Sequence, residues 1–270
     1  MRRSTGLGFL LLLCSILGPA AVLHAQIAIP EGLTHEYTLQ PGERLDGQLV
    51  VASTSEEPVY VTLELRDYLF FADGTTLYEE PGTVSRSNAS WIQLFVSSPV
   101  LIPPGEELQV PYTIAVPETE TLAGTYWCIL LVAPAPAEAR AEDGLSITTV
   151  LSYGIQFVTH IGSTGTRSVR ALGASLAEAT DGVVLEVDIE NDGERWVRPE
   201  VWAELYDADG VKIGDYPSGQ LRIFPGTSVR YAFALGQLAP GAYRTVIILD
   251  DRGLAAWAAQ YTLNIVDADG

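Results

Sequence analysis

Apolar and polar residues alternate along much of this chain, in short runs separated by glycine and proline. The longest regular run covers residues 145–161, where odd positions are mostly apolar or threonine and even positions are mostly small or polar. A period of two is that of a β-strand, whose successive side chains point to opposite faces. No amphipathic helix longer than two turns is expected anywhere, so the pattern predicts an all-β protein.

Residues 91–136 indicate which all-β architecture to expect. This segment contains three short apolar runs, which are divided by Pro103-Pro104-Gly105, by Pro117 and by Gly124. Short strands separated by Gly/Pro turns are typical of immunoglobulin-like β-sandwiches. Further strands are expected at residues 33–39, 47–54, 58–71, 145–161, 183–189, 197–206, 220–224, 229–235, 244–249 and 258–266.

A weak internal repeat indicates two related domains. The segment LIPPGEELQVPYTIAVPETETLAGTYWCILLV parallels IFPGTSVRYAFALGQLAPGAYRTVIIL, and both have the order Pro-Gly, strand, spacer, Gly-x-Tyr, strand. We therefore expect two tandem immunoglobulin-like sandwiches, at residues 26–165 and 166–270, joined by the glycine-containing linker 162–166. In the second, Tyr243 follows Pro240-Gly241, which predicts the tyrosine corner of such domains.

The first 25 residues have the pattern of a secretory signal peptide. Arg2 and Arg3 precede an apolar stretch at residues 6–17, and a small-residue cleavage site follows at Ala25. The alternative is a lipoprotein signal with Cys14 as the modified residue. In either case we expect an exported protein of the periplasm or cell surface. No later segment has 18 uninterrupted apolar residues, so no membrane span is expected in the mature chain.

The charge excludes two classes of partner. The chain has 34 acidic and 15 basic residues and a formal net charge of −19. Nucleic acids and anionic membranes are bound through clustered Lys and Arg, so neither is expected as a partner. The acidity is consistent either with solubility or adaptation to salt, or with a basic partner.

No arrangement of residues predicts catalysis, a cofactor or a metal site. Beyond the signal segment the chain has one cysteine, Cys128, which lies in the apolar run TYWCILLV and is expected to be buried. The acidic segment at residues 207–210 lacks the twelve-residue calcium-loop spacing and is better explained as a turn. We therefore expect a protein that is not an enzyme and that needs no cofactor or metal.

Two features are candidate binding sites. The strand at residues 145–161 either completes a sheet or forms a sheet edge to which a partner adds a strand. The side chains on one face of that edge would be Leu145, Ile147, Thr149, Leu151, Tyr153, Ile155 and Phe157. Trp196, which lies near Arg195 and Arg198, is the candidate for an exposed aromatic residue that could stack on a sugar.

The order of these features resembles the periplasmic pilus-chaperone (PapD-like) superfamily, which has two immunoglobulin-like domains. The matching segments are SSPVLIPPGEELQVPYTIAVP, TYWCILLVAPAP, ARAEDG and LSITTVLSYGIQFVTHIG. The resemblance implies a chaperone-like or adaptor protein that binds pilus- or fimbria-type envelope subunits by strand addition. Chaperones of this family anchor a subunit's C-terminal carboxylate with an Arg near the first strand and a Lys in the last strand. The corresponding segments here, LTHEYTLQPG and residues 145–161, contain neither.

A second resemblance supports an alternative function. The Trp, Pro-Pro-Gly and Gly-x-Tyr pattern of the first domain is similar to that of a peptidoglycan-binding domain of Gram-positive surface proteins. It implies a module that binds the cell wall or a glycan through exposed aromatic residues. In that case the partner would be a glycan, whereas strand addition requires a protein partner in the envelope.

Overall fold

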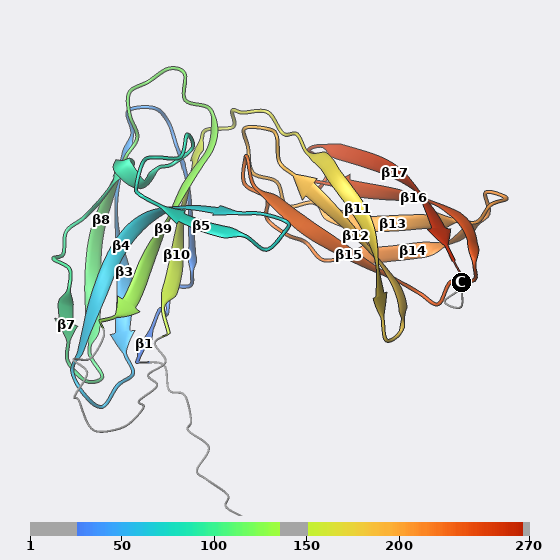
Figure 1. Ribbon diagram of the computed structural model, residues 1–270. Coiled ribbons are helices and arrows are strands. Elements are labelled where there is room, and N and C mark those ends of the chain that lie inside the picture. The colour runs from blue at the N-terminus through green and yellow to red at the C-terminus, as the bar shows by residue number, and fades with distance from the viewer. Residues whose placement is uncertain (1–25, 136–150, 267–270) are drawn as a thin grey trace, which may run out of the picture.

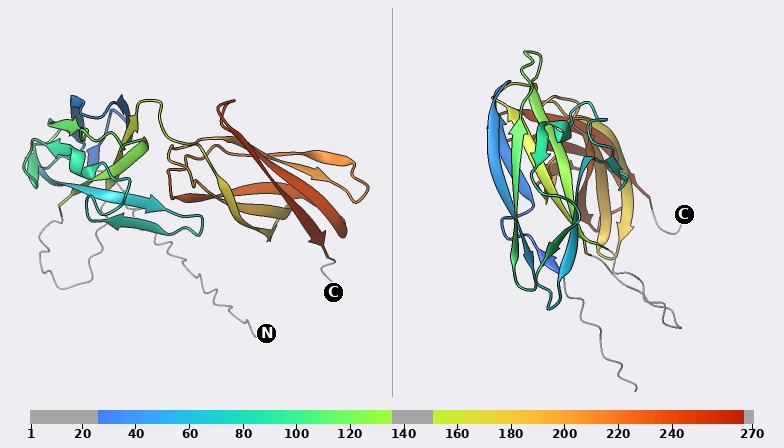
Figure 2. Two further views of the ribbon diagram at one scale, coloured as in Figure 1. Left: turned by 90° about the horizontal axis from the view of Figure 1, so that it is seen from above. Right: turned by 90° about the vertical axis from the view of Figure 1, so that its left-hand side faces the viewer.

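The computed structural model describes residues 26–135 and 151–266, which form two β-sandwiches and confirm the predicted all-β fold class. The chain passes from the first sandwich to the second between Ile161 and Arg170. In Figure 1 the two sandwiches lie side by side, and the hairpin of β4 (Val59–Phe70) and β5 (Thr76–Glu79) reaches from the first toward the second. Figure 2 shows the same arrangement from above and from one side.

The first sandwich consists of two sheets. One has the strand order β1 (Ile27–Ala28), β3 (Arg44–Ser53), β8 (Glu107–Ala115) and β6 (Ile92–Leu94). The other has the order β2 (Thr34–Leu39), β10 (Tyr153–Ile161), β9 (Gly124–Pro134), β4 and β5, with β7 (Val100–Ile102) also paired to β4. A short 3-10 helix, η1 (Ala89–Trp91), precedes β6. The N-terminal segment therefore contributes β1 to one sheet and β2 to the other.

The core of the first sandwich follows from the alternation along its strands. In β10 the odd positions Ile155 and Phe157 are completely buried between the sheets. In β9 the even positions Cys128, Leu130 and Val132 are buried in the same core. Burial raises the pKa of the Cys128 thiol well above its ordinary value. This confirms the expectation that Cys128 is a buried apolar residue.

The second sandwich also has two sheets. Three strands form one sheet, in the order β11 (Arg170–Ala179), β12 (Gly182–Glu190) and β15 (Ser228–Gly236). Four strands form the other, in the order β14 (Lys212–Ser218), β13 (Glu200–Tyr206), β16 (Gly241–Asp250) and β17 (Ala256–Ile265). The inward positions of these strands, among them Leu185, Leu205, Phe233 and Ile247, make a separate core.

The second sandwich differs from the sequence-based expectations in two places. Residues 220–224 are not a strand, because Ile223 makes only an isolated bridge to Val197 and the strand of this region is β14. Strand β11 was not expected, because its sequence RALGASLAEA is rich in alanine and has no apolar alternation. It forms by pairing with β12, and almost every residue in it is exposed.

The internal repeat corresponds to a shared path of the chain. In both sandwiches a Pro-Gly turn precedes a strand in one sheet, β8 or β15, and the next strand, β9 or β16, lies in the opposite sheet. The hydroxyl of Tyr243 donates to the carbonyl of Ala239 at 2.8 Å, which confirms the tyrosine corner. Across residues 26–135 and 151–266, no helix has the length and apolar character needed to cross a membrane.

Candidate functional site

Strand β10 has a hydrogen-bonding neighbour on both sides for only part of its length. It pairs with β9 from Tyr153 to Ile161, but its parallel pairing with β2 begins at Gln156, which is in register with Thr34. There the N–H of Gln156 donates to the carbonyl of Leu33 at 2.9 Å. Within the described part of the chain, residues 153–155 therefore have β9 on one side and no strand on the other.

Gly154 presents the backbone groups of this free edge. Successive residues of a strand direct their N–H and C=O groups to opposite neighbours, so Gly154 faces the same side as Gln156. Among residues 26–135 and 151–266, no backbone hydrogen bond reaches Gly154 from that side. The free edge is a short template on which one more strand could pair.

Part of the predicted strand-addition surface lies outside the described residues. This applies to Leu145, Ile147 and Thr149. Leu151 is described, precedes β10 and has a side chain that is 46% exposed. It is therefore an apolar side chain in solvent at the start of the free edge.

The structure separates the remaining predicted residues into two groups. Tyr153 and Ile155 lie in the part of β10 that has a free edge, Tyr153 half-buried and Ile155 in the core. Phe157 lies outside that edge, because β2 takes this position with His35 in register. The expectation of an edge strand along all of residues 145–161 is thus corrected at its C-terminal half, where β10 is an interior strand.

The outer face of the β10 sheet packs against the second sandwich. Trp127 and Val158 are opposite each other in the register of β9 and β10, and both are buried against Phe224 of the second sandwich. The rings of Trp127 and Phe224 are stacked, with centroids 4.7 Å apart and planes 11° apart. The rings of Phe70 in β4 and Phe224 meet edge to face, with their centroids 6.1 Å apart. The two sandwiches therefore share a small apolar core.

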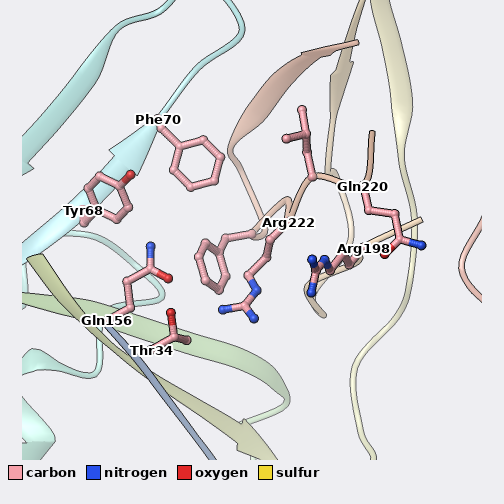
Figure 3. A pocket seen from close by; sticks show the side chains of 9 residues that line it. Thr34, Tyr68, Phe70, Gln156, Arg198, Gln220 and Arg222 are labelled. Carbon is pink, nitrogen blue, oxygen red and sulfur yellow. The ribbon is translucent and has the colours of Figure 1, made fainter. Parts of the chain in front are cut away.

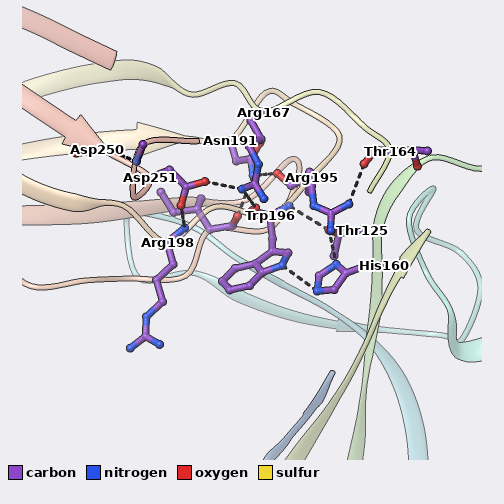
Figure 4. Close-up of polar contacts among 12 residues, drawn as sticks. Thr125, His160, Thr164, Arg167, Asn191, Arg195, Trp196, Arg198, Asp250 and Asp251 are labelled. Atoms are coloured by element: carbon purple, nitrogen blue, oxygen red, sulfur yellow. Dashed lines mark hydrogen bonds and ion pairs between the residues drawn. The ribbon is translucent and has the colours of Figure 1, made fainter. Parts of the chain in front are cut away.

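A polar cluster lies beside this shared core (Figure 4). The indole N–H of Trp196 donates to Nε2 of His160 at 2.9 Å, and the backbone N–H of Trp196 donates to Oγ1 of Thr125 at 3.1 Å. The other ring nitrogen of His160 lies 3.0 Å from Thr125 Oγ1. Burial lowers the pKa of His160 to about 4, and the nearby Arg195 acts in the same direction. His160 and Thr125 come from the first sandwich and Trp196 from the second.

The backbones of the two sandwiches also touch directly. The N–H of Thr125 donates to the carbonyl of Glu194 at 2.9 Å. A Cβ atom at Gly124 would lie 2.0 Å from that carbonyl oxygen, and Gly124 has a φ of 81°. Arg195 donates to the carbonyls of Gly162 and Thr164 in the linker, at 3.1 and 2.9 Å. Close contact at this point requires glycine at position 124.

The contacts between the sandwiches around Gly124, Thr125, His160 and residues 194–196 are called the joint below. Trp196 is part of this joint, which corrects its expected role as an exposed aromatic residue. Its ring lies nearly parallel to His160, with centroids 5.8 Å apart, and the Arg222 guanidinium lies 4.6 Å from the ring centroid. Its N–H is used by His160.

A pocket of about 350 Å³ opens between the sandwiches (Figure 3). Thr34 and Gln156, the residues at which β2 begins to pair with β10, form part of its wall. The other lining residues are Tyr68, Phe70, Arg198, Gln220, Leu221, Arg222 and Phe224. The pocket therefore lies at the end of the free edge of β10 and combines aromatic rings, amides and two guanidinium groups.

The two arginines differ in their contacts. Arg222 forms an ion pair with Glu36 of β2 and lies over the ring of Trp196. The Arg198 guanidinium is the one cationic side chain in the described ranges with no ion pair, hydrogen bond or aromatic contact. In Figure 3 the side chains of both arginines extend toward the same side of the pocket as Gln156 and Thr34. In so acidic a chain, two arginines at one pocket are an unusual local excess of positive charge.

The sequence did not predict this pocket, because its walls come from segments more than 180 residues apart. Arg198 and Arg222 occur in RWVRP and QLRIF, which have no motif that relates them to β2 or β10. The first strand and residues 145–161 contain no Arg or Lys, whereas the structure brings two arginines to this place from the second sandwich.

The described residues include no group of three or more His, Cys, Asp or Glu side chains placed to hold a metal ion. The Asp207 carboxylate accepts hydrogen bonds from the N–H groups of Asp209 and Val211, at 3.0 and 2.8 Å. This is the geometry of a turn, as the sequence predicted.

The fold is similar to several solved structures, all at low sequence identity. No protein-family model and no curated protein matches the sequence. A chain from a chaperone–tip adhesin complex of CFA/I fimbriae biogenesis is 11% identical, with a TM-score of 0.49 over 87% of this chain and 98% of that chain. A chain from the Salmonella enterica complex of the SafA pilin with the SafB chaperone is 11% identical, with a TM-score of 0.45 over 90% and 99%. The E. coli chaperone DraB is 11% identical, with a TM-score of 0.40 over 89% and 96%.

Proposed function

We propose that this protein is a non-catalytic, exported, chaperone-like or adaptor protein that binds a partner protein of the cell envelope by β-strand addition. The observation that carries this proposal is the free edge of β10 at residues 153–155, which ends at the pocket between the sandwiches. An extended partner segment would pair with the backbone of Gly154. Main-chain hydrogen bonds would supply affinity, and pockets for alternate side chains would supply specificity.

The side chains beside this edge fit an apolar partner strand. Leu151, Tyr153 and Ile155 share one face by the period of two, and that face continues into the core of the first sandwich. A partner strand would place its own alternate apolar side chains against these residues. The exposed side chain of Leu151 would then be removed from water.

The pocket supports an acidic group as the second feature of the partner. Arg198 and Arg222 could bind a carboxylate through charge-assisted hydrogen bonds, and the guanidinium of Arg198 has no ion pair that would first have to be broken. The carboxylate would be a chain terminus or an acidic side chain of the partner. We therefore propose a pilus- or fimbria-type subunit as the partner, with the exported location that the first 25 residues predict.

The strand-addition proposal is tested with a matched pair of variants. Leu151→Asp places a charge at the free edge of β10, whereas Leu77→Asp places one on an exposed leucine of the opposite edge strand, β5. We expect Leu151→Asp to weaken binding of the envelope protein captured by the wild type by roughly 30-fold or more, because about 2 kcal/mol of apolar burial is lost. Leu77→Asp should bind like the wild type.

The measurement is affinity capture from an envelope extract, followed by titration of the purified partner. Hydrogen exchange in the complex should show new protection of the Gly154 amide, which lies on the free edge. Equal binding by the two aspartate variants, or an unprotected Gly154 amide in the complex, would rule out addition at β10. Capture on purified wall polymer without any protein partner would favour a glycan-binding module instead.

A separate prediction concerns the pocket. Arg198→Gln should weaken binding of the same partner about tenfold, because one charge-assisted hydrogen bond to a carboxylate is lost. Arg244→Gln is the matched control, since Arg244 lies against Tyr206 in the second sandwich and does not line the pocket. Isothermal titration with each variant makes the comparison, and a partner whose acidic group has been amidated should not distinguish Arg198→Gln from the wild type. If both arginine variants lose affinity equally, the effect is one of overall charge and the pocket has no specific role.

A further inference from the structure

We propose that His160 is an acid-sensitive latch between the two sandwiches: neutral His160 holds Trp196 of the second sandwich, and a proton on His160 releases it. The groups involved come from strands β9 and β10 of the first sandwich and from the segment that contains Arg195 and Trp196 in the second. The latch is a property of the joint itself and requires no partner.

The donors and acceptors fix the protonation state of the closed joint. An indole N–H can only donate, so Nε2 of His160, which lies 2.9 Å from Trp196 Nε1, must be the unprotonated acceptor. The proton of a neutral ring is then on Nδ1, which donates to Thr125 Oγ1 at 3.0 Å. That hydroxyl oxygen also accepts from the backbone N–H of Trp196 at 3.1 Å. A second proton on His160 would have to occupy Nε2, where it would face the indole N–H.

The charges around His160 make the closed joint resist protonation. His160 is 6% exposed, and burial lowers its pKa to about 4, with Arg195 and Arg222 acting in the same direction. Glu36 of β2 opposes them, since its carboxylate oxygen lies 3.7 Å from Nε2. Glu36 also forms an ion pair with Arg222, so a proton on His160 would give that carboxylate a second cation to bind.

The pH dependence of opening follows from the difference in the pKa of His160 between the closed and open states. A histidine with a lowered pKa in the closed state favours closure fully above its ordinary pKa of 6.5, and this contribution is lost as the pH falls from 6.5 toward about 4. With a pKa of 6.5 in the open state, the equilibrium constant for opening should rise roughly 30-fold between about pH 7.5 and about pH 5.0. Opening would move Arg198 and Arg222 relative to β10. On the proposed function, it would therefore change the site for the partner.

The test measures opening of the joint with no partner present, so its outcome is independent of strand addition. Val158 is buried in the shared apolar core, and a Val158→Cys substitution in a Cys14→Ser, Cys128→Ala background places the only thiol of the chain there. The rate at which a dipyridyl disulfide reacts with this thiol, divided by its rate with an unfolded peptide in the same buffer, reports opening. We expect this ratio to rise roughly 30-fold between about pH 7.5 and about pH 5.0.

Three variants test whether His160 and its contact with Trp196 cause the rise in this ratio. His160→Gln keeps an acceptor but cannot be protonated, so the rise should fall below about threefold. His35→Gln is the matched control, because His35 is partly buried in the first sandwich away from the joint, and the full rise should remain. Trp196→Phe removes the indole donor while His160 is retained, and it should also reduce the rise. The latch is refuted if the wild-type ratio does not change with pH, or if the full rise persists in His160→Gln. A full rise in Trp196→Phe would refute the part of the proposal that assigns the indole N–H as the group His160 holds.

Discussion

Replacing Trp127 with alanine should lower the free energy of unfolding by about 3–5 kcal/mol and separate the unfolding of the two sandwiches. Among the described residues, Trp127 is the largest fully buried side chain, and it lies between the sandwiches with the centroid of its ring 4.7 Å from that of Phe224. Its indole N–H donates to the carbonyl of Tyr68 at 2.7 Å. The substitution would leave a cavity in the shared apolar core and would remove the donor to the partly buried carbonyl of Tyr68.

Chemical denaturation and calorimetry measure this effect. We expect one cooperative transition for the wild type and two for Trp127→Ala, because the aromatic stack is lost and the contacts that remain between the two cores are mostly polar. Trp202→Ala is the control, since Trp202 lies partly exposed on β13, away from the joint. Trp127→Phe keeps most of the ring and should cost only about 1–2 kcal/mol. A single transition in Trp127→Ala, with the stability of the wild type, would show that the aromatic stack does not couple the sandwiches.

The second large effect is expected at Asp67, a carboxylate that is 1% exposed. It accepts hydrogen bonds from the N–H groups of Gly82 and Val84, at 3.1 and 2.8 Å, and from the hydroxyl of Ser87. These bonds hold the segment after β5, in which Ser87 pairs with Trp127 of β9. Asp67→Ala should therefore lower the free energy of unfolding by about 3 kcal/mol, because three donors, among them the buried hydroxyl of Ser87, lose their acceptor.

Two further variants separate the charge of Asp67 from its geometry. Asp67→Asn keeps one acceptor oxygen in place and should cost less than Asp67→Ala, about 1–2 kcal/mol. Asp73→Ala is the matched control, because Asp73 accepts from the N–H of Thr75 in an exposed turn and should cost less than about 1 kcal/mol. Urea denaturation measures all three. If Asp67→Ala is no less stable than Asp73→Ala, the buried carboxylate does not anchor this segment.

The features that the sequence predicted correctly are those determined by residues close together in the chain. Alternation along residues 58–71 and 183–189 predicted β4 and β12, and Pro240-Gly241 before Tyr243 predicted the tyrosine corner. The apolar surroundings of Cys128 in the sequence predicted its burial. In each case the pattern is complete within about a dozen residues, so it can be recognised without knowledge of the partner strands.

The expectations that needed correction depended on contacts between distant segments. Residues 145–161 alternate throughout, yet only pairing with β2 decides that Phe157 is interior and that residues 153–155 have a free edge. Strand β11 has no apolar alternation and exists because β12 pairs with it. A strand pattern shows which side chains share a face, but it does not show how many neighbours the strand has.

By itself, the sequence determined the all-β class, the two related sandwiches and the face of each regular strand, because these follow from side-chain period and turn chemistry. Only the tertiary structure decided where positive charge meets the free edge of β10, since Arg198 and Arg222 reach the pocket from the second sandwich. It also decided that Trp196 is held by His160 and Arg222 within the joint. These contacts depend on how two distinct cores pack together, and the short-range sequence pattern contains no information about that packing.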